Sequence, residues 1–158
     1  MALNLTSDEF EDGDRIPDRH TCTGDDFSPS FSWDGDPEAT QGFVLLCENP
    51  DAPDAPDGTL RHWAIFDIPL STKWLGAGLG RQAQFGPMRQ SVNDFGTMGY
   101  SGPCPPEGRG IHHYHFRLFA LSVPKLEILI NPSCSDVEEA AKSHILEKAV
   151  LTGTYSRG

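Results

Sequence analysis

Two histidines and a tyrosine stand where polar loops meet segments that alternate like β-strands. His112 and Tyr114 follow a loop at 102–110 that is rich in glycine and proline, and His62 opens a second alternating segment. Imidazole and phenol groups donate hydrogen bonds, and such a loop leaves backbone N–H groups free of helix or sheet partners. These residues predict a polar binding pocket. The alternative is that His62, His112 and Tyr114 only cap a sheet edge with satisfied hydrogen bonds.

Three predicted strands would position these side chains. Alternation after the loop predicts a strand from residue 112 to 120 whose apolar face carries His112, Tyr114, Phe116, Leu118 and Ala120. Residues 42–48 are apolar on both faces, as in a central strand, and lead into Asn49-Pro50-Asp51-Ala52-Pro53. The third strand, 61–69, is predicted to place His62, Ala64, Phe66 and Ile68 on one face and Arg61, Trp63, Ile65 and Asp67 on the other.

The remaining segments predict a mainly β fold with few helices. Short strands are expected near 3–6 and 30–33, an irregular connection over 70–99, and a closing strand at 150–156. Ser135 and Glu138 are spaced as a capping box, which predicts one C-terminal helix that ends near 148 or 149. Thirteen prolines and sixteen glycines favour turns over long helices.

Length and charge limit the class of protein. A chain of 158 residues suits one domain, 1–158, and a net charge of −11 disfavours binding to nucleic acid or anionic membranes. No signal-like or membrane-spanning apolar run is found, so a cytoplasmic protein is expected. The four cysteines are irregularly spaced, and we expect free thiols in that compartment. They are Cys22, Cys47, Cys104 and Cys134.

Two reactive arrangements remain as alternatives to a binding pocket. Cys104 with His62 or His112 would supply a thiol nucleophile and its base, as in a hydrolase. His113 and His115 share one strand face, which is a metal-ligand spacing, but no third ligand is tied to them by spacing. No cofactor or metal is therefore assigned.

Four motifs in order give the chain a family resemblance. They are Asn49-Pro-Asp-Ala-Pro53, His62-Trp63 with Asp67-Ile-Pro69, Tyr100-x-Gly-Pro-Cys-Pro-Pro106 with His112-x-Tyr114, and Leu151-x-Gly-Thr-Tyr155. Nearly the whole chain thereby resembles the phosphatidylethanolamine-binding protein (PEBP) family, in its bacterial and archaeal Raf-kinase-inhibitor-like YbhB/YbcL branch.

The resemblance implies a β-sandwich of two antiparallel sheets with a C-terminal helix, and an anion pocket. It implies binding of phosphate, a phospholipid headgroup or a phosphorylated side chain, without a common catalytic activity. A regulatory role resembling kinase inhibition, an unknown protein partner and a homodimer are left open. Asn49 replaces the family's first aspartate, which we expect to make anion binding less dependent on pH. The implied ligand-binding residues are Asn49, Asp51, Ala52, Pro53, His62, Gly102, Pro103, Cys104, Pro105, Pro106, His112 and Tyr114.

Overall fold

Two antiparallel sheets and one short helix make up the computed structural model, which describes residues 2–53, 55 and 57–158. The smaller sheet has the order β1 (Asn4–Thr6), β2 (Phe31–Asp34) and β5 (Trp74–Leu75). The larger sheet has the order β6 (Gln84–Phe85), β7 (Met88–Gln90), β4 (Leu60–Pro69), β3 (Gly42–Asn49), β8 (His112–Leu121) and β9 (Ile145–Tyr155). Two 3₁₀ turns lie at Asp18–His20 and Lys142–His144. The predicted β-sandwich with a C-terminal helix is confirmed.

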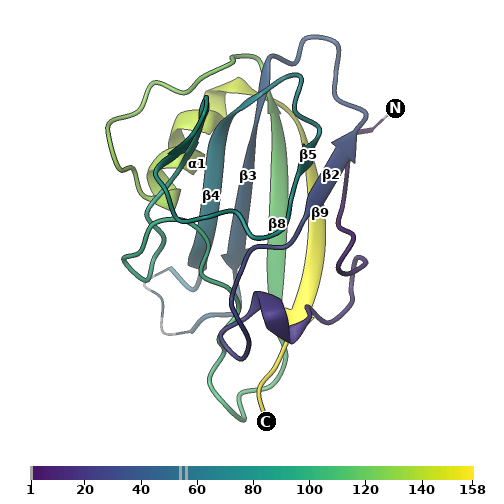
Figure 1. Ribbon diagram of the computed structural model, residues 1–158, viewed down its shortest axis with the longest axis vertical. Helices are drawn as coiled ribbons and strands as arrows, with labels where there is room; N and C mark the ends of the chain where they lie inside the picture. Colours follow the sequence, from purple (N-terminus) through teal and green to yellow (C-terminus); the bar gives the residue numbers. More distant parts are fainter. Residues whose placement is uncertain (1, 54, 56) are drawn as a thin grey trace.

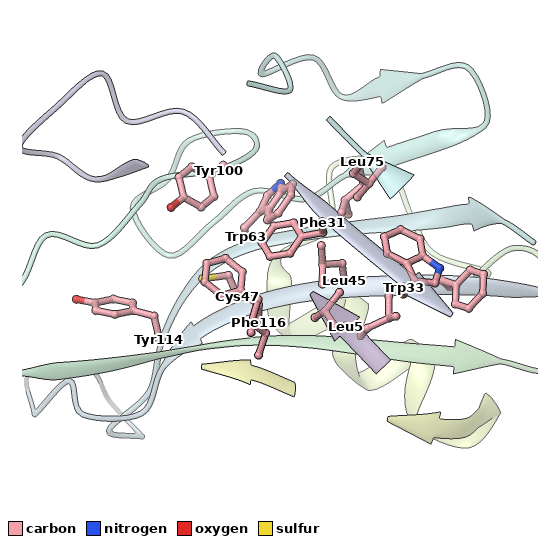
Figure 2. Packing of buried hydrophobic residues seen from close by; sticks show 14 of the residues in the cluster. Leu5, Phe31, Trp33, Leu45, Cys47, Trp63, Leu75, Tyr100, Tyr114 and Phe116 are labelled. Atoms are coloured by element: carbon pink, nitrogen blue, oxygen red, sulfur yellow. The ribbon is translucent and has the colours of Figure 1, made fainter. Parts of the chain in front are cut away.

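The main core lies between the two sheets. Phe31 of β2 packs its ring 4.9 Å from that of Phe116 on β8 and 6.2 Å from that of Trp63 on β4. Figure 2 shows this cluster, with Phe31 beside Trp63 and Leu45 from the larger sheet. Side chains of a strand alternate between faces, so Phe43 and Leu45 of β3 join this core while Val44 and Leu46 point to the other side.

The helix α1 (Cys134–Ala141) covers the opposite face of the larger sheet, near β3 and β4 (Figure 1). Val137 and Ala141 of the helix are fully buried against Val44 and Phe66. The larger sheet is therefore apolar on both faces in its central strands. This arrangement explains why residues 42–48 show no alternation in the sequence.

Two irregularities interrupt the pairing of β3 with β4. Cys47 pairs with Trp63 and Glu48 with Arg61, so His62 is the extra residue of a bulge. A second shift lies between Phe43 and Leu45, opposite a backbone turn at Asp67 with φ of 56°. Because of this shift Ile68 joins the main core with Trp63 and Ile65, whereas Ala64 and Phe66 face α1. The predicted common face of His62, Ala64, Phe66 and Ile68 is wrong, since simple alternation fails at a bulge.

The C-terminal helix is shorter than the sequence predicted. Its capping box uses Ser133 and Asp136, not Ser135 and Glu138, and the helix ends at Ala141. Residues 145–149 belong to the long strand β9, which pairs with β8 along its whole length. Ile145 and Ala149 fit a helical spacing, but pairing with β8 satisfies the backbone groups of this segment, and tertiary contacts override so weak a local pattern.

The connection 70–99 also contains more structure than expected. Its short strands β5, β6 and β7 extend both sheets, and β7 pairs with β4 through Ile65 and Phe66. No helix in the described part of the chain is long and apolar enough to cross a membrane.

Candidate functional site

Three central strands have one of their ends at the same end of the larger sheet. β3 ends at Asn49, while its antiparallel neighbours β4 and β8 begin at Leu60 and His112. Antiparallel pairing therefore brings Asn49, His62 and His112 to the same end of the sheet, although they lie far apart in the sequence. Three polar side chains that the sequence pattern singled out therefore lie at one end of the larger sheet.

Asn49 and His112 form a buried pair whose proton positions follow from the hydrogen bonds. The Asp51 backbone N–H can only donate, and it lies 2.8 Å from Asn49 Oδ1. The Asn49 amide nitrogen then faces His112 Nδ1 at 3.0 Å and donates to it. A neutral His112 ring with Nδ1 as acceptor carries its proton on Nε2. The Nε2–H group is the donor that this ring can offer to a ligand.

Asp51 is engaged by a neighbouring histidine. Its Oδ2 accepts hydrogen bonds from the His113 backbone N–H at 2.9 Å and from His113 Nδ1 at 2.8 Å. Partial burial opposes ionisation, but the hydrogen bonds from His113 outweigh it and lower the pKa of Asp51. His113 is thus tied to Asp51, and the described residues contain no cluster of three or more metal-ligating side chains.

His62 lies beneath the surface, enclosed by aromatic rings. Its Nδ1 donates to the Ser101 carbonyl at 2.6 Å, and its ring packs 5.3 Å from that of Tyr114 and 5.1 Å from that of Phe95. Nε2 is buried, and it has no hydrogen-bond partner among the residues that the structure describes. Burial lowers the pKa of His62 to about 4, and burial also raises the pKa of Tyr114. Both side chains are therefore neutral at physiological pH.

The buried His62 predicts an acid-sensitive fold. The unfolded chain takes up the His62 proton near the ordinary pKa of 6.5 and the folded chain only near 4, so the unfolded state gains protons first as the pH falls. The free energy of unfolding should drop by about 3 kcal/mol between these two values because of this residue. Urea unfolding measured across that range should show a flatter profile for His62→Gln, which keeps a donor for Ser101. The partly exposed His144→Gln serves as the control, and an unchanged profile in His62→Gln would contradict the assignment.

A cavity of about 820 Å³ opens beside the Asn49–His112 pair. Eight of the twelve predicted binding residues line it, namely Asn49, Asp51, Ala52, Pro53, Cys104, Pro105, Pro106 and His112. The other four, His62, Gly102, Pro103 and Tyr114, are buried residues outside the lining. Gly102 and Pro103 directly precede the lining residue Cys104, and the rings of His62 and Tyr114 pack against each other.

The N-terminal segment anchors the loop that forms one wall of this cavity. The Tyr100 hydroxyl donates a hydrogen bond to the His20 carbonyl at 2.6 Å, and the Gly102 N–H donates one to the Asp26 side chain at 2.9 Å. A methyl group on Gly102 would lie 2.1 Å from the His20 carbonyl oxygen, so this contact requires glycine. The sequence assigned no such role to the first forty residues.

A disulfide joins the same two segments. Cys22 is bonded to Cys104 across 82 positions of sequence, with their Cα atoms 5.3 Å apart. The prediction of four free thiols is wrong for this pair and confirmed for the buried Cys47 and Cys134. Sequence spacing gave no sign of the bond, because it depends on the N-terminal segment folding over the loop.

Two arginines that line the cavity were not among the binding residues predicted from the sequence. Arg61 directly precedes His62 and pairs with Asp57 at 3.1 Å. Arg109 lies within the glycine-rich loop, lines the cavity, and has no ion-pair partner within the described ranges. The position of Arg109 between Gly108 and Gly110 was the available signal. Asp94 and Ser135 also line the cavity, and tertiary contacts alone bring them there, because neither belongs to a motif of the site.

Comparison with known proteins identifies the family. The model of the family described as phosphatidylethanolamine-binding protein matches residues 6–156, nearly the whole chain. The chain belongs to the phosphatidylethanolamine-binding protein family. A UPF0098 protein of Aquifex aeolicus is 42% identical over 155 residues, which cover 98% of this chain and 89% of that protein. Escherichia coli YbhB is 34% identical, with 98% of this chain and 100% of YbhB covered.

The solved structures of PEBP family members agree with this assignment. E. coli YbcL, described as a new member of the mammalian PEBP family, superposes with a TM-score of 0.92 at 31% identity and covers 100% of both chains. A PEBP homologue from Chlamydia trachomatis gives a TM-score of 0.87 at 33% identity, with 99% of each chain covered. The resemblance to the YbhB/YbcL branch is therefore confirmed.

Proposed function

We propose that residues 1–158 form a single PEBP-like domain that binds a small anionic or phosphorylated ligand in the cavity beside His112. The observation that carries this proposal is that one cavity is lined by two donors with no acceptor among the described residues, the Nε2–H group of His112 and the guanidinium of Arg109. Hydrogen bonds from such donors to phosphate or carboxylate oxygens are charge-assisted and strong. We take phosphate, a phospholipid headgroup and a phosphorylated side chain as the candidate ligands.

Among the described residues, each aspartate that lines the cavity is hydrogen-bonded to a neighbouring group, which orients its carboxylate away from free competition for the two donors but leaves its charge in place. Asp51 is bound by His113, Asp57 by Arg61, and Asp94 accepts the Arg61 backbone N–H at 2.8 Å. The proposed ligand site consists of the twelve predicted residues together with Arg109. Within it, His112 and Arg109 contact the ligand, while His62 and Tyr114 support the His112 side of the wall.

We further propose a binding protein rather than an enzyme. The competing hydrolase needs a Cys104 thiolate as its nucleophile, and Cys104 is bonded to Cys22. A regulatory role through a protein partner, and a homodimer, belong to the same proposal. A cytoplasmic location stays part of this proposal, although the disulfide is more typical of an oxidising compartment.

Titration with inorganic phosphate and with phosphorylethanolamine tests the binding site. We expect NMR shifts centred on residues 49–52 and 104–112 in the wild type. His112→Ala and Arg109→Gln should each weaken binding about tenfold or more, since each removes one charge-assisted hydrogen bond. His144→Ala is the matched control, because His144 lies outside the cavity lining. Equal affinity in the wild type and both cavity variants would contradict the proposal.

A further inference from the structure

The cavity wall is held between two anchors. On one side the disulfide and the Cys22 N–H, which donates to the Pro103 carbonyl at 3.1 Å, fix residues 103–104 to the N-terminal segment. On the other side Arg157 Nε donates to the Pro105 carbonyl at 2.7 Å, and the Gly108 N–H donates to the Arg157 carbonyl at 2.9 Å. The lining residues Cys104, Pro105 and Pro106 span the short distance between these anchors.

The disulfide is the one covalent link among these contacts, and it lies at the surface. Cys22 and Cys104 are both exposed residues, so a thiol reagent can approach their sulfur atoms. The other two cysteines differ. Cys47 and Cys134 are buried, and burial raises the pKa of both thiols, that of Cys134 to about 12. Neither has the thiolate needed to attack the disulfide from within the protein.

We infer that the Cys22–Cys104 disulfide is a redox latch that sets the order of the cavity wall and thereby the affinity of the proposed anion site. This inference rests on the proposed function for its effect on ligand, and on the fold alone for its effect on the wall. Oxidised, the bond holds Cys104 and the neighbouring prolines in a fixed position. In the reduced protein, the hydrogen bonds of Tyr100, Gly102 and Pro103 still join the wall to the N-terminal segment, and those of Pro105 and Gly108 still join it to Arg157.

The chemical step requires a dithiol reductant. Its thiolate attacks one sulfur of the disulfide, forms a mixed disulfide and releases the other cysteine as a thiolate, which takes up a proton. The second thiol of the reductant then closes the reductant's own disulfide and releases the remaining cysteine. Two electrons and two protons pass to Cys22 and Cys104, and the reductant is oxidised.

Reduction should weaken ligand binding without unfolding the sheets. A wall that samples more conformations must be ordered again when the ligand binds, and this ordering reduces affinity. The remaining hydrogen bonds limit the change, so we expect loosening of the two segments and not their separation. The strands β3, β4 and β8 are held by their own hydrogen-bond ladders and should stay paired in the reduced protein.

Amide hydrogen exchange and phosphate titration on the same samples test the latch. The samples are the oxidised protein, the protein reduced with dithiothreitol, the re-oxidised protein, and a Cys22→Ser/Cys104→Ser variant with and without dithiothreitol. We expect exchange in residues 19–26 and at the backbone amides of Ser101, Gly102 and Cys104 to become about tenfold faster on reduction, while β3 and β8 remain the slowest-exchanging segments. The dissociation constant for inorganic phosphate should rise about threefold or more. Re-oxidation should reverse both changes. The double variant should show the exchange rates and phosphate affinity of the reduced protein, and dithiothreitol should not change them.

The outcomes separate the latch from the proposed function. Unchanged exchange in both segments would overturn the latch, as would a dithiothreitol response that persists in the double variant, which still contains Cys47 and Cys134. Faster exchange with an unchanged phosphate affinity would overturn control of the site by the disulfide. If phosphate binds neither form, the proposed anion site fails, and the exchange data alone decide whether the disulfide orders the wall.

Discussion

Replacing Asp67 by alanine is expected to lower the free energy of unfolding by about 3–5 kcal/mol, the range for breaking a buried ion pair by removing one partner. The Asp67 side chain is 1% exposed, and its Oδ2 accepts a hydrogen bond from Arg89 Nε at 2.9 Å. Its Oδ1 accepts the Leu126 N–H at 2.9 Å. One carboxylate therefore joins β4, β7 and the segment that leads to α1. Its loss would leave the Arg89 charge unpaired in a half-buried position.

Asp67→Asn is the informative companion variant. Asparagine tolerates the left-handed backbone at this position, where alanine adds strain, and its amide oxygen can still accept the Leu126 N–H. In urea unfolding, we expect Asp67→Asn to lower the free energy of unfolding by less than Asp67→Ala does. The exposed Asp25→Ala should change stability by less than about 0.5 kcal/mol. An Asp67→Ala effect as small as that of Asp25→Ala would show that the ion pair contributes little.

Removal of the Cys22–Cys104 disulfide is expected to lower the free energy of unfolding by about 4.5 kcal/mol. The bond closes a loop across 82 positions of sequence. Closing a loop of this length removes conformational entropy from the unfolded chain that corresponds to about 4.5 kcal/mol in the loop-entropy model. Denaturant unfolding of the wild type with and without dithiothreitol measures this difference, and Cys22→Ser/Cys104→Ser should reproduce the reduced value.

A contrary result has a clear form. If dithiothreitol leaves the denaturation midpoint of the wild type unchanged while thiol titration shows that the bond has been reduced, the disulfide does not stabilise the fold through the unfolded chain.

Asp67 and the disulfide also lie at different ends of the larger sheet, because β4 runs from the cavity end of the sheet towards Asp67. Asp67→Asn should therefore leave phosphate affinity unchanged, which separates loss of stability from loss of the site.

The strands around the site could be predicted because their signals are local. Alternation along 112–121 depends only on neighbouring residues, and the side chains predicted for its core face, from His112 to Ala120, are all buried. The uniformly apolar run before Asn49 likewise predicted a central strand, and antiparallel order then brought Asn49 and His112 together. Sequence motifs added the family, which the comparisons confirm.

Local signals failed where tertiary contacts decide the outcome. The bulge at His62 turns this side chain away from the face that simple alternation assigns, and encloses it between Tyr114 and Phe95. Residues 145–149 join β9, although their spacing also fits a helix, because β8 offers them a long ladder of hydrogen bonds. Both errors have the same cause, since periodicity describes one segment and pairing involves two.

The sequence by itself determined the mainly β class and the three central strands, because apolar periodicity is a local signal. Its family motifs also marked Asn49 and His112 as members of one pocket. Only the tertiary structure decided which further residues join the cavity wall and what anchors it. Cys22 reaches Cys104, Arg109 joins His112 in one cavity, and Asp26 binds the Gly102 N–H because a segment from the start of the chain folds over a loop about eighty residues later. Contacts between such distant positions leave no periodic signal in either segment.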